Sequence, residues 1–351
     1  MRILITGGCG FIGSAVVRHL IRSTAHQVVN VDKMTYAASL DALEEAARSD
    51  RHTHIRADIT DAPAMREVFA THAPDAVMHL AAESHVDRSI DGPGDFIHTN
   101  VVGTFVMLEA ARAHWAGLAA DAKAAFRFHH VSTDEVFGAL EAGDPPFTET
   151  TPYDPRSPYS ASKAGSDHLV RAWWHTYGLP TFVTNTTNNY GPWQFPEKLI
   201  PLVTLNAFEG KVLPVYGDGS NQRDWLFVDD HAVALVLALE RAPPGSTLAI
   251  GARQPRSNLQ VVRAICATLD RLAPDPAGPR ERLIEFVRDR PGHDFRYEID
   301  PAQSKATLDW TAPHDFDRGL KRTVRWYLDN RAWWEGIRGA KYAGQRLGTA
   351  A

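Results

Sequence analysis

The feature that most constrains the fold is the glycine-rich sequence GGCGFIG at residues 7–13. It follows a short apolar segment at residues 3–6 and precedes residues 14–22, whose apolar side chains recur at helical spacing. Glycines between a strand and a helix permit a tight turn and let the backbone approach a pyrophosphate at the helix N-terminus. Because glycines most often mark ordinary turns, this interpretation depends on the segments around them.

Strand-like and helix-like segments alternate through the first half of the chain. The predicted strands lie at residues 3–6, 27–31, 53–57, 76–80, 126–132 and 180–185. The predicted helices lie at residues 14–22, 64–71, 99–114 and 159–177. Strands that alternate with helices form βαβ units, so we expect an α/β fold with a Rossmann-type doubly wound parallel sheet.

Asp32 ends the second predicted strand, nineteen residues after Gly13. A carboxylate at this position accepts both hydroxyls of an adenosine ribose and repels a 2′-phosphate, which favours NAD over NADP. The alternative is an ordinary acid at a strand end, which the preceding glycines make the weaker interpretation. Asp58 and Ile59 follow the third strand and are candidates for contacts with adenine; without the glycines they would be a loop acid and a core residue.

The character of the sequence changes after residue 187, where Pro and Gly separate short elements. We therefore expect an NAD-binding Rossmann domain at residues 1–187 and a smaller, mainly substrate-binding C-terminal region at residues 188–351. A later segment, residues 225–250, is expected to return to the first domain.

Composition excludes several classes of protein. With 44% hydrophobic and 23% charged residues, the 351-residue chain is not disordered, collagen-like or a coiled coil. The net charge of −5 gives no basic footprint for nucleic acid. The longest apolar run, residues 232–239, is far shorter than the ~20 residues of a membrane helix. Two distant cysteines and sixteen histidines form no disulfide framework or metal motif, so we expect a cytoplasmic chain without a metal site.

Tyr159 and Lys163 lie four residues apart at the start of a predicted helix and therefore share one face. A nearby ammonium and the positive nicotinamide of an oxidised cofactor would lower the tyrosine pKa. Such a tyrosine can take a proton from a substrate hydroxyl while a hydride leaves the same carbon. By itself the pair would be an ordinary surface contact; beside a dinucleotide loop it predicts catalysis.

Thr133, Asp134 and Glu135 follow the fifth predicted strand, at the sheet edge where α/β proteins place their sites. Thr133 can hydrogen-bond a substrate hydroxyl. Two adjacent carboxylates are often only solvated loop residues or helix caps. Here their location favours chemistry, because two acids in different environments can divide into an acid and a base.

Ordered motifs extend this pattern along the chain. They are HLAAESHVDRS (79–89), NVVGT (100–104), STDEVFG (132–138), YSASK (159–163), NNYGP (188–192), FPEKLIP (195–201), VYGDGSNQRDW (215–225) and DRPGHD (289–294). With the glycine loop, the set resembles the extended short-chain dehydrogenases and, in full, the dTDP-glucose 4,6-dehydratases, up to about residue 334. The Asp134–Glu135 pair carries much of the discrimination, since related decarboxylases usually have Ser-Glu there and epimerases usually lack the pair.

The resemblance implies a lyase mechanism with regenerated NAD. Tyr159 would deprotonate the 4-hydroxyl of the glucose while NAD takes a hydride from C4. Glu135 would then remove the C5 proton that the new ketone acidifies, and Asp134 would protonate the departing 6-hydroxyl. Return of the hydride to C6 would give the 4-keto-6-deoxy sugar nucleotide.

The resemblance also implies the binding residues. The cofactor contacts would be Gly7, Gly10, Phe11, Ile12, Gly13, Asp32, Lys33, Met34, Thr35, Asp58, Ile59, Leu80, Ala81, Ala82, Thr99, Tyr159, Lys163 and Asn189. The substrate contacts would be Ser84, Thr133, Asn188, Lys198, Leu199, Pro214, Val215, Tyr216, Arg223, Asn258, Asp289, Arg290, Pro291, Gly292 and His293. Tyr216 would stack on the base, and the Arg223 fork suits a pyrophosphate. Without the resemblance, Tyr216 would be interpreted as an amphipathic rim residue and Arg223 as a surface arginine.

Several alternatives remain open. Tyr216 and Asp224–Trp225 favour dTDP over UDP, but a UDP-glucose dehydratase, another sugar-nucleotide epimerase or decarboxylase, and a non-catalytic dinucleotide sensor share parts of the pattern. Members of the family usually dimerise through helices that correspond to residues 99–114 and 159–177, so a homodimer is expected. Two residues depart from the family pattern: Cys9 replaces an alanine in the glycine loop, and Phe137 replaces the tyrosine of DEVYG.

Overall fold

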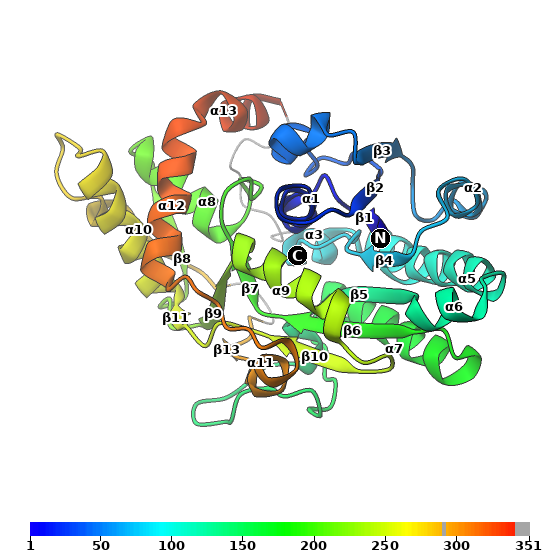
Figure 1. Ribbon diagram of the computed structural model, residues 1–351. Coiled ribbons are helices and arrows are strands. Elements are labelled where there is room, and N and C mark those ends of the chain that lie inside the picture. Colours follow the sequence, from blue (N-terminus) through cyan, green and yellow to red (C-terminus); the bar gives the residue numbers. More distant parts are fainter. Residues whose placement is uncertain (290–292, 341–351) are drawn as a thin grey trace.

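A seven-stranded parallel sheet forms the centre of the computed structural model, which describes residues 1–289 and 293–340 (Figure 1). Its strand order is β10-β6-β5-β4-β1-β2-β3. The strands are β1 (Arg2–Thr6), β2 (Gln27–Asp32), β3 (His52–Arg56), β4 (Ala76–His79), β5 (Arg127–Thr133), β6 (Thr181–Thr186) and β10 (Thr247–Ile250). The order reverses between β1 and β4, and a sheet of this kind has its binding crevice there, at the carboxyl ends of the strands. The predicted Rossmann-type sheet is confirmed.

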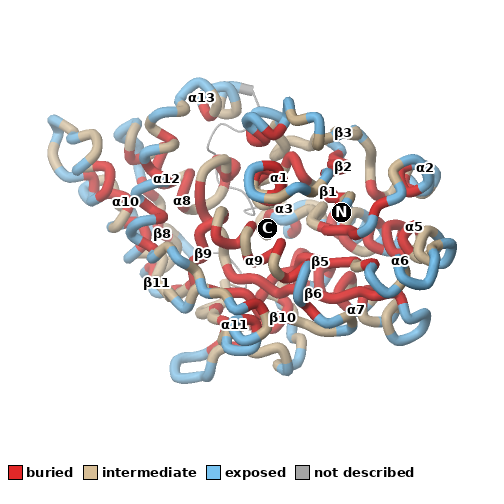
Figure 2. The backbone as a smooth tube through the Cα atoms, in the orientation of Figure 1, coloured by how far each residue is buried: buried red, intermediate tan, exposed pale blue. Residues whose placement is uncertain are grey.

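Helices cover both faces of the sheet because the strand side chains alternate between two cores. Ile3 and Ile5 of β1 belong to the core made with α1 (Phe11–Ser23) and α9 (Val228–Arg241), whereas Leu4 belongs to the opposite core. The opposite core is made with α2 (Ala62–His72), α5 (Gly103–Ala116) and α7 (Pro158–Tyr177). Burial on both faces explains the continuous apolar run at residues 3–5 of β1, and Figure 2 shows β5 and β6 as buried throughout most of their length.

The start of α7 is fixed by local sequence. Ser157 is the N-cap and forms a capping box with Ser160, and Pro158 occupies the first turn, where its missing N–H costs nothing. The helix ends at Gly178, which adopts a left-handed conformation with φ 71°. The capping box therefore sets where the first turn of α7 begins, and this turn contains Tyr159.

A second, smaller region lies beside the sheet, on the left in Figure 1. It contains β7 (Asn188–Tyr190), β8 (Leu213–Tyr216), β9 (Gln222–Phe227), β11 (Pro255–Ser257), β12 (Ile284–Val287) and β13 (Arg296–Tyr297). Its core is closed by α8 (Leu199–Phe208), α10 (Asn258–Leu272) and α12 (Phe316–Asp329). After β9, the chain returns to the large sheet through α9 and β10. The division into domains at residue 187 stays a prediction.

Short elements that carried no periodic signal complete the described chain. They are η1 (Asp41–Arg48), α3 (Val86–Asp91), α4 (Pro93–Phe96), η2 (Ile97–Val102), α6 (Ala120–Ala125), η3 (Asp134–Phe137), η4 (Arg280–Leu283), α11 (Ala302–Leu308) and α13 (Arg331–Ala340). The helix predicted at residues 99–114 begins with the π-turn η2 and continues as α5. None of the helices within residues 1–289 and 293–340 is long and apolar enough to span a membrane.

Candidate active site

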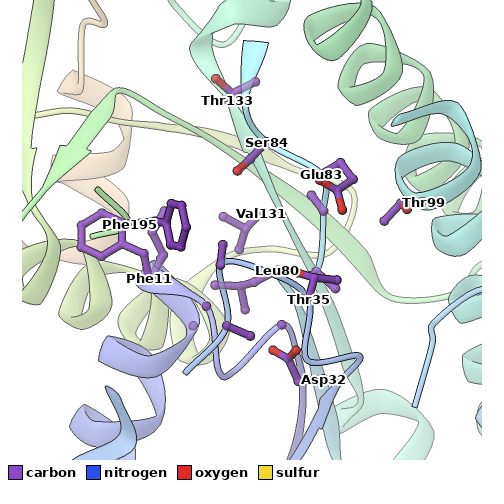
Figure 3. A pocket seen from close by; sticks show the side chains of 18 of the residues that line it. Phe11, Asp32, Thr35, Leu80, Glu83, Ser84, Thr99, Val131, Thr133 and Phe195 are labelled. Atoms are coloured by element: carbon purple, nitrogen blue, oxygen red, sulfur yellow. The ribbon is translucent and has the colours of Figure 1, made fainter. Parts of the chain in front are cut away.

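A cleft lies at the carboxyl ends of the strands, where the strand order reverses. Its walls come from the loops after β1 to β5, from the first turns of α7, and from residues 186–198. Figure 3 shows Asp32 at one end of the cleft and Thr133 at the other, with Leu80 and Val131 between them. Of the eighteen residues predicted to contact a cofactor, only Met34 does not line this cleft.

The backbone of the glycine turn encloses a small space, which we call the glycine cradle and which side chains at these positions would fill. Gly7 has φ 74°, and a Cβ on Gly13 would lie 2.1 Å from the carbonyl oxygen of Gly7. Gly10 is the N-cap of α1 and supplies no side chain to its first N–H groups, which leaves them available to an anion. This turn fits the pyrophosphate of a dinucleotide.

Asp32 is held in place by backbone donors from both neighbouring loops. Its Oδ2 accepts from the Cys9 N–H at 2.9 Å, and its Oδ1 accepts from the Met34 N–H at 2.8 Å. Met34 thus contributes its backbone, while its side chain packs against the core outside the cleft. Cys9 is buried, and burial raises the pKa of its thiol to about 12, so at this position it acts as a small apolar side chain.

The Tyr159–Lys163 pair lies in the same cleft, and both side chains are buried. The Lys163 Nζ donates to the Val131 carbonyl at 2.9 Å. Burial raises the pKa of Tyr159, the charge of Glu135 raises it further, and a hydrogen bond with Thr133 lowers it. The predicted lowering of the Tyr159 pKa includes the positive nicotinamide of a bound cofactor, so it stays a prediction for the NAD complex. In the chain alone, burial raises this pKa.

The two acids occupy different environments, although they are adjacent in sequence. Thr133 caps η3, and its Oγ1 accepts from the Glu135 N–H at 3.2 Å. Glu135 lines the cleft. Asp134 is only 1% exposed, and burial, followed by the charges of Glu135 and Asp224, raises its pKa well above the usual range. Among the described residues its Oδ2 has no hydrogen-bond partner, which costs an ionised carboxylate more than a neutral acid.

The residues predicted to contact substrate divide into two groups. Ser84, Thr133, Asn188 and Lys198 line the cleft, and the Lys198 Nζ donates to the Ser84 carbonyl at 3.0 Å. The second group lies in the smaller region: Leu199, Pro214, Val215, Tyr216, Arg223, Asn258, Asp289 and His293. Arg290, Pro291 and Gly292 lie outside the described residues.

The second group is spread over the first residues of α8 and α10, strands β8 and β9, and residues 289 and 293. Tyr216 on β8 pairs with the end of β12, and its ring is 6.2 Å from that of His293. Val215 is buried in the core of the smaller region. Arg223 is also buried; its guanidinium donates to the carbonyls of residues 222, 294 and 295 and lies 4.2 Å from the Tyr297 ring centroid. The predicted Arg223 fork thus contacts backbone carbonyls in this structure.

Comparison with known proteins identifies the group to which these features belong. The family model described as GDP-mannose 4,6 dehydratase matches residues 4–323. The dTDP-glucose 4,6-dehydratase of Neisseria meningitidis serogroup B is 58% identical, with 99% of both chains covered. The dTDP-glucose 4,6-dehydratase 1 of Escherichia coli K12 is 56% identical over 97% of both chains. The chain belongs to the dTDP-glucose 4,6-dehydratase family.

Solved structures support the same grouping. DesIV of Streptomyces venezuelae, a dTDP-glucose 4,6-dehydratase solved with NAD and TYD bound, matches with a TM-score of 0.87 and 41% identity. The match covers 96% of this chain and all of that one. The UDP-glucose 4-epimerase of Thermotoga maritima, solved with UDP-glucose, gives a TM-score of 0.82 at 27% identity, covering 94% of this chain and all of that one. The fold is thus shared with epimerases, while the higher identities lie among the dehydratases.

Sequence reasoning missed a set of residues that joins the two sides of this dehydratase-family cleft. Glu197 has a side chain only 2% exposed and accepts from the Arg88 Nε at 2.9 Å and from the Tyr36 hydroxyl at 3.3 Å. The Arg88 guanidinium also lies 4.0 Å from the Tyr36 ring centroid, and Phe195 packs edge-on against that ring. The motif FPEKLIP contained the signal, but its glutamate was not singled out.

Phe137, the second departure from the family pattern, lies in an apolar cluster. Its ring centroid is 5.2 Å from that of Phe147 and 5.3 Å from that of Tyr153. It is buried with Val136 and Leu140 and does not line the cleft. Phe137 is the last residue of η3, which begins with the acid pair, and it contributes to this element by packing in the apolar cluster.

Proposed function

We propose that the chain converts dTDP-glucose into dTDP-4-dehydro-6-deoxyglucose and water with NAD as a bound cofactor. The observation that carries this proposal is the Asp134–Glu135 pair, with one acid buried and one in the cleft, in the same site as Tyr159. The identity of 54–58% to dTDP-glucose 4,6-dehydratases supports it. The glycine cradle and Asp32 would hold the dinucleotide.

The first step is oxidation at C4 of the glucose. Bound NAD supplies a hydride acceptor, and later a hydride donor, in contact with the sugar. Tyr159 accepts the proton of the 4-hydroxyl, and the Thr133 hydroxyl orients the same oxygen. Lys163, one helical turn after Tyr159, supplies a positive charge. Its ammonium is held in place by a hydrogen bond to the Val131 carbonyl. This charge favours the phenolate that Tyr159 needs as a base.

The second step is loss of water across C5 and C6. A ketone at C4 makes the neighbouring C5 proton acidic, so the carboxylate of Glu135 can remove it. Asp134 then donates its proton to the departing 6-hydroxyl, which leaves as water. Burial, which raises the pKa of Asp134 well above its usual range, supports this division of roles. Reprotonation at C5 accompanies the return of hydride to C6.

The nucleotide is proposed to bind over the smaller region. Tyr216, with its ring near His293, would stack on the base, and Asn188, Lys198, Arg223 and Asn258 would surround the diphosphate. Arg223 would have to exchange carbonyl partners for phosphate oxygens. We expect faster turnover of dTDP-glucose than of UDP-glucose when both are incubated at equal concentration and the loss of one water is followed by mass spectrometry. Turnover of UDP-glucose alone would overturn the nucleotide assignment, and no product from either would overturn the proposed function.

A homodimer is proposed to form through α5 and α7. Phe105 on α5 and Tyr177 on α7 are each 45% exposed, and Trp173 lies between them in edge-on contact with both rings. Ile97 and Val102 add exposed apolar side chains on η2. Sedimentation should give the mass of a dimer, and Phe105→Glu should shift it towards monomer. A monomeric wild-type chain at micromolar concentration would contradict the proposal.

A cytoplasmic location is also proposed. Cys9 and Cys266 are both buried and free, which suits a reducing compartment. Fractionation of cells that express the chain would test it, and recovery outside the cytoplasmic fraction would contradict it.

A further inference from the structure

A buried carboxylate lies directly behind the Tyr159–Lys163 pair and has no part in the mechanism above. Asp167 follows Lys163 by one helical turn of α7 and is fully buried. Its Oδ2 accepts from the Ser132 hydroxyl at 2.8 Å, from the Tyr153 hydroxyl at 2.8 Å and from the Asn185 Nδ2 at 3.2 Å. Three donors from three different segments therefore converge on one oxygen, which fixes the carboxylate firmly.

The carboxylate is connected to Lys163 through His130 on β5. The His130 Nε2 is 3.1 Å from the Asp167 Oδ1 and 3.4 Å from the Lys163 Nζ. Burial lowers the pKa of His130 to about 4, so its imidazole is neutral at physiological pH. The ammonium and the carboxylate thus both lie close to the same nitrogen of a neutral ring.

The same carboxylate is tied to the strand that carries the acid pair. Asn185 on β6 donates to Asp167 and also to the Thr133 carbonyl at 3.0 Å. Ser132, which donates to Asp167, immediately precedes Thr133 on β5. A change in Asp167 would therefore disturb the end of β5 as well as Lys163.

We propose that Asp167 is a positioning residue for the reaction, because its fixed carboxylate is the counter-ion that keeps the Lys163 ammonium charged and in place behind Tyr159. The role in turnover rests on the proposed function, whereas the pairing of the two charges does not. Nothing in the mechanism requires Asp167 to touch the substrate.

The electrostatics of the surroundings agree with this role. The titratable groups that interact with Lys163 are His130 on β5, Asp167 on α7 and His79 on β4. Burial lowers the pKa of Lys163 to about 8, and the charge of Asp167 opposes this lowering. The Lys163 charge is therefore present below about pH 8 and is lost as the pH rises through that value. Without Asp167, the loss would occur at lower pH.

The direct test is an NMR titration of lysine side chains labelled at Nζ and Cε in the NAD-loaded protein. The chain has only eight lysines, and the Lys163 signal is assigned by its loss in Lys163→Met. In Asp167→Asn we expect the pKa of Lys163 to fall by roughly 1–3 units, the effect of a nearby opposite charge. The matched control is Tyr153→Phe, which removes one hydrogen bond to Asp167 but keeps the charge, and it should leave the lysine pKa near the wild-type value.

One further readout, on the wild type, keeps the proposal falsifiable if Asp167→Asn does not fold. In the wild type, the carbon signal of the Asp167 carboxyl should be that of an ionised group at neutral pH; a protonated Asp167 would overturn the proposal. In a folded variant, the alkaline fall of kcat should move to lower pH while KM for dTDP-glucose changes little. An unchanged Lys163 pKa in Asp167→Asn would overturn the pairing. Because this pKa is measured without turnover, that result can be told apart from a failure of the proposed function.

Discussion

The double variant Asp134→Asn with Glu135→Gln is expected to oxidise dTDP-glucose at C4 and then stop. Tyr159 and Lys163 remain, so hydride transfer should proceed, and the absorbance of reduced nicotinamide should rise and persist. Dehydration loses both its acid and its base. Because a positioned acid or base contributes roughly 10²–10⁴-fold each, formation of the 4-keto-6-deoxy product should become undetectable. The measurement combines that absorbance with the mass of the product.

Tyr159→Phe is the matched control, because it removes the base of the first step and keeps both acids. It should give neither reduced nicotinamide nor product. If the double variant still loses water at the wild-type rate, the assignment of Asp134 and Glu135 as acid and base is wrong. If it forms no reduced nicotinamide while still binding NAD, the two steps are not separable as proposed.

Gly13→Ala is expected to weaken NAD binding by about 10- to 100-fold. The new Cβ would lie 2.1 Å from the Gly7 carbonyl oxygen and 2.8 Å from the Gly8 Cα, which are backbone atoms that cannot rotate away. Relieving such a contact costs about 1–3 kcal/mol and opens the turn that holds the pyrophosphate. Calorimetric titration with NAD measures the affinity, and a thermal melt checks that the variant folds.

Gly336→Ala is the matched control for this change, because a Cβ on Gly336 of α13 meets no atom within 4 Å. It should bind NAD as the wild type does. Wild-type affinity in a folded Gly13→Ala protein would show that the glycine turn does not hold the cofactor.

Local signals made much of this fold predictable from sequence. The glycines, the alternation of strands and helices, and Asp32 at a strand end each depend on neighbours in the chain, and they predicted the sheet and the turn that begins α1. The start of α7 is similarly local, because Ser157 and Ser160 form its capping box.

Properties that depend on three-dimensional surroundings were not predictable. Glu197 is separated from Tyr36 by 161 residues and from Arg88 by 109, so no periodicity could place them together. The rise of the Tyr159 pKa in the chain alone was not predictable, because it follows from burial, which sequence spacing does not show. Val215 matched a binding motif, and its burial follows from the alternation along β8, where Pro214 and Tyr216 are less buried.

The measurement that tests the central claim most directly is turnover of dTDP-glucose that carries deuterium at C4. If one bound NAD takes the hydride from C4 and returns it to C6 of the same sugar, the 4-keto-6-deoxy product should retain the deuterium at C6, as read by NMR and mass. Loss of the deuterium to solvent would contradict the proposed function. An epimerised product that retains the deuterium at C4 would contradict it as well.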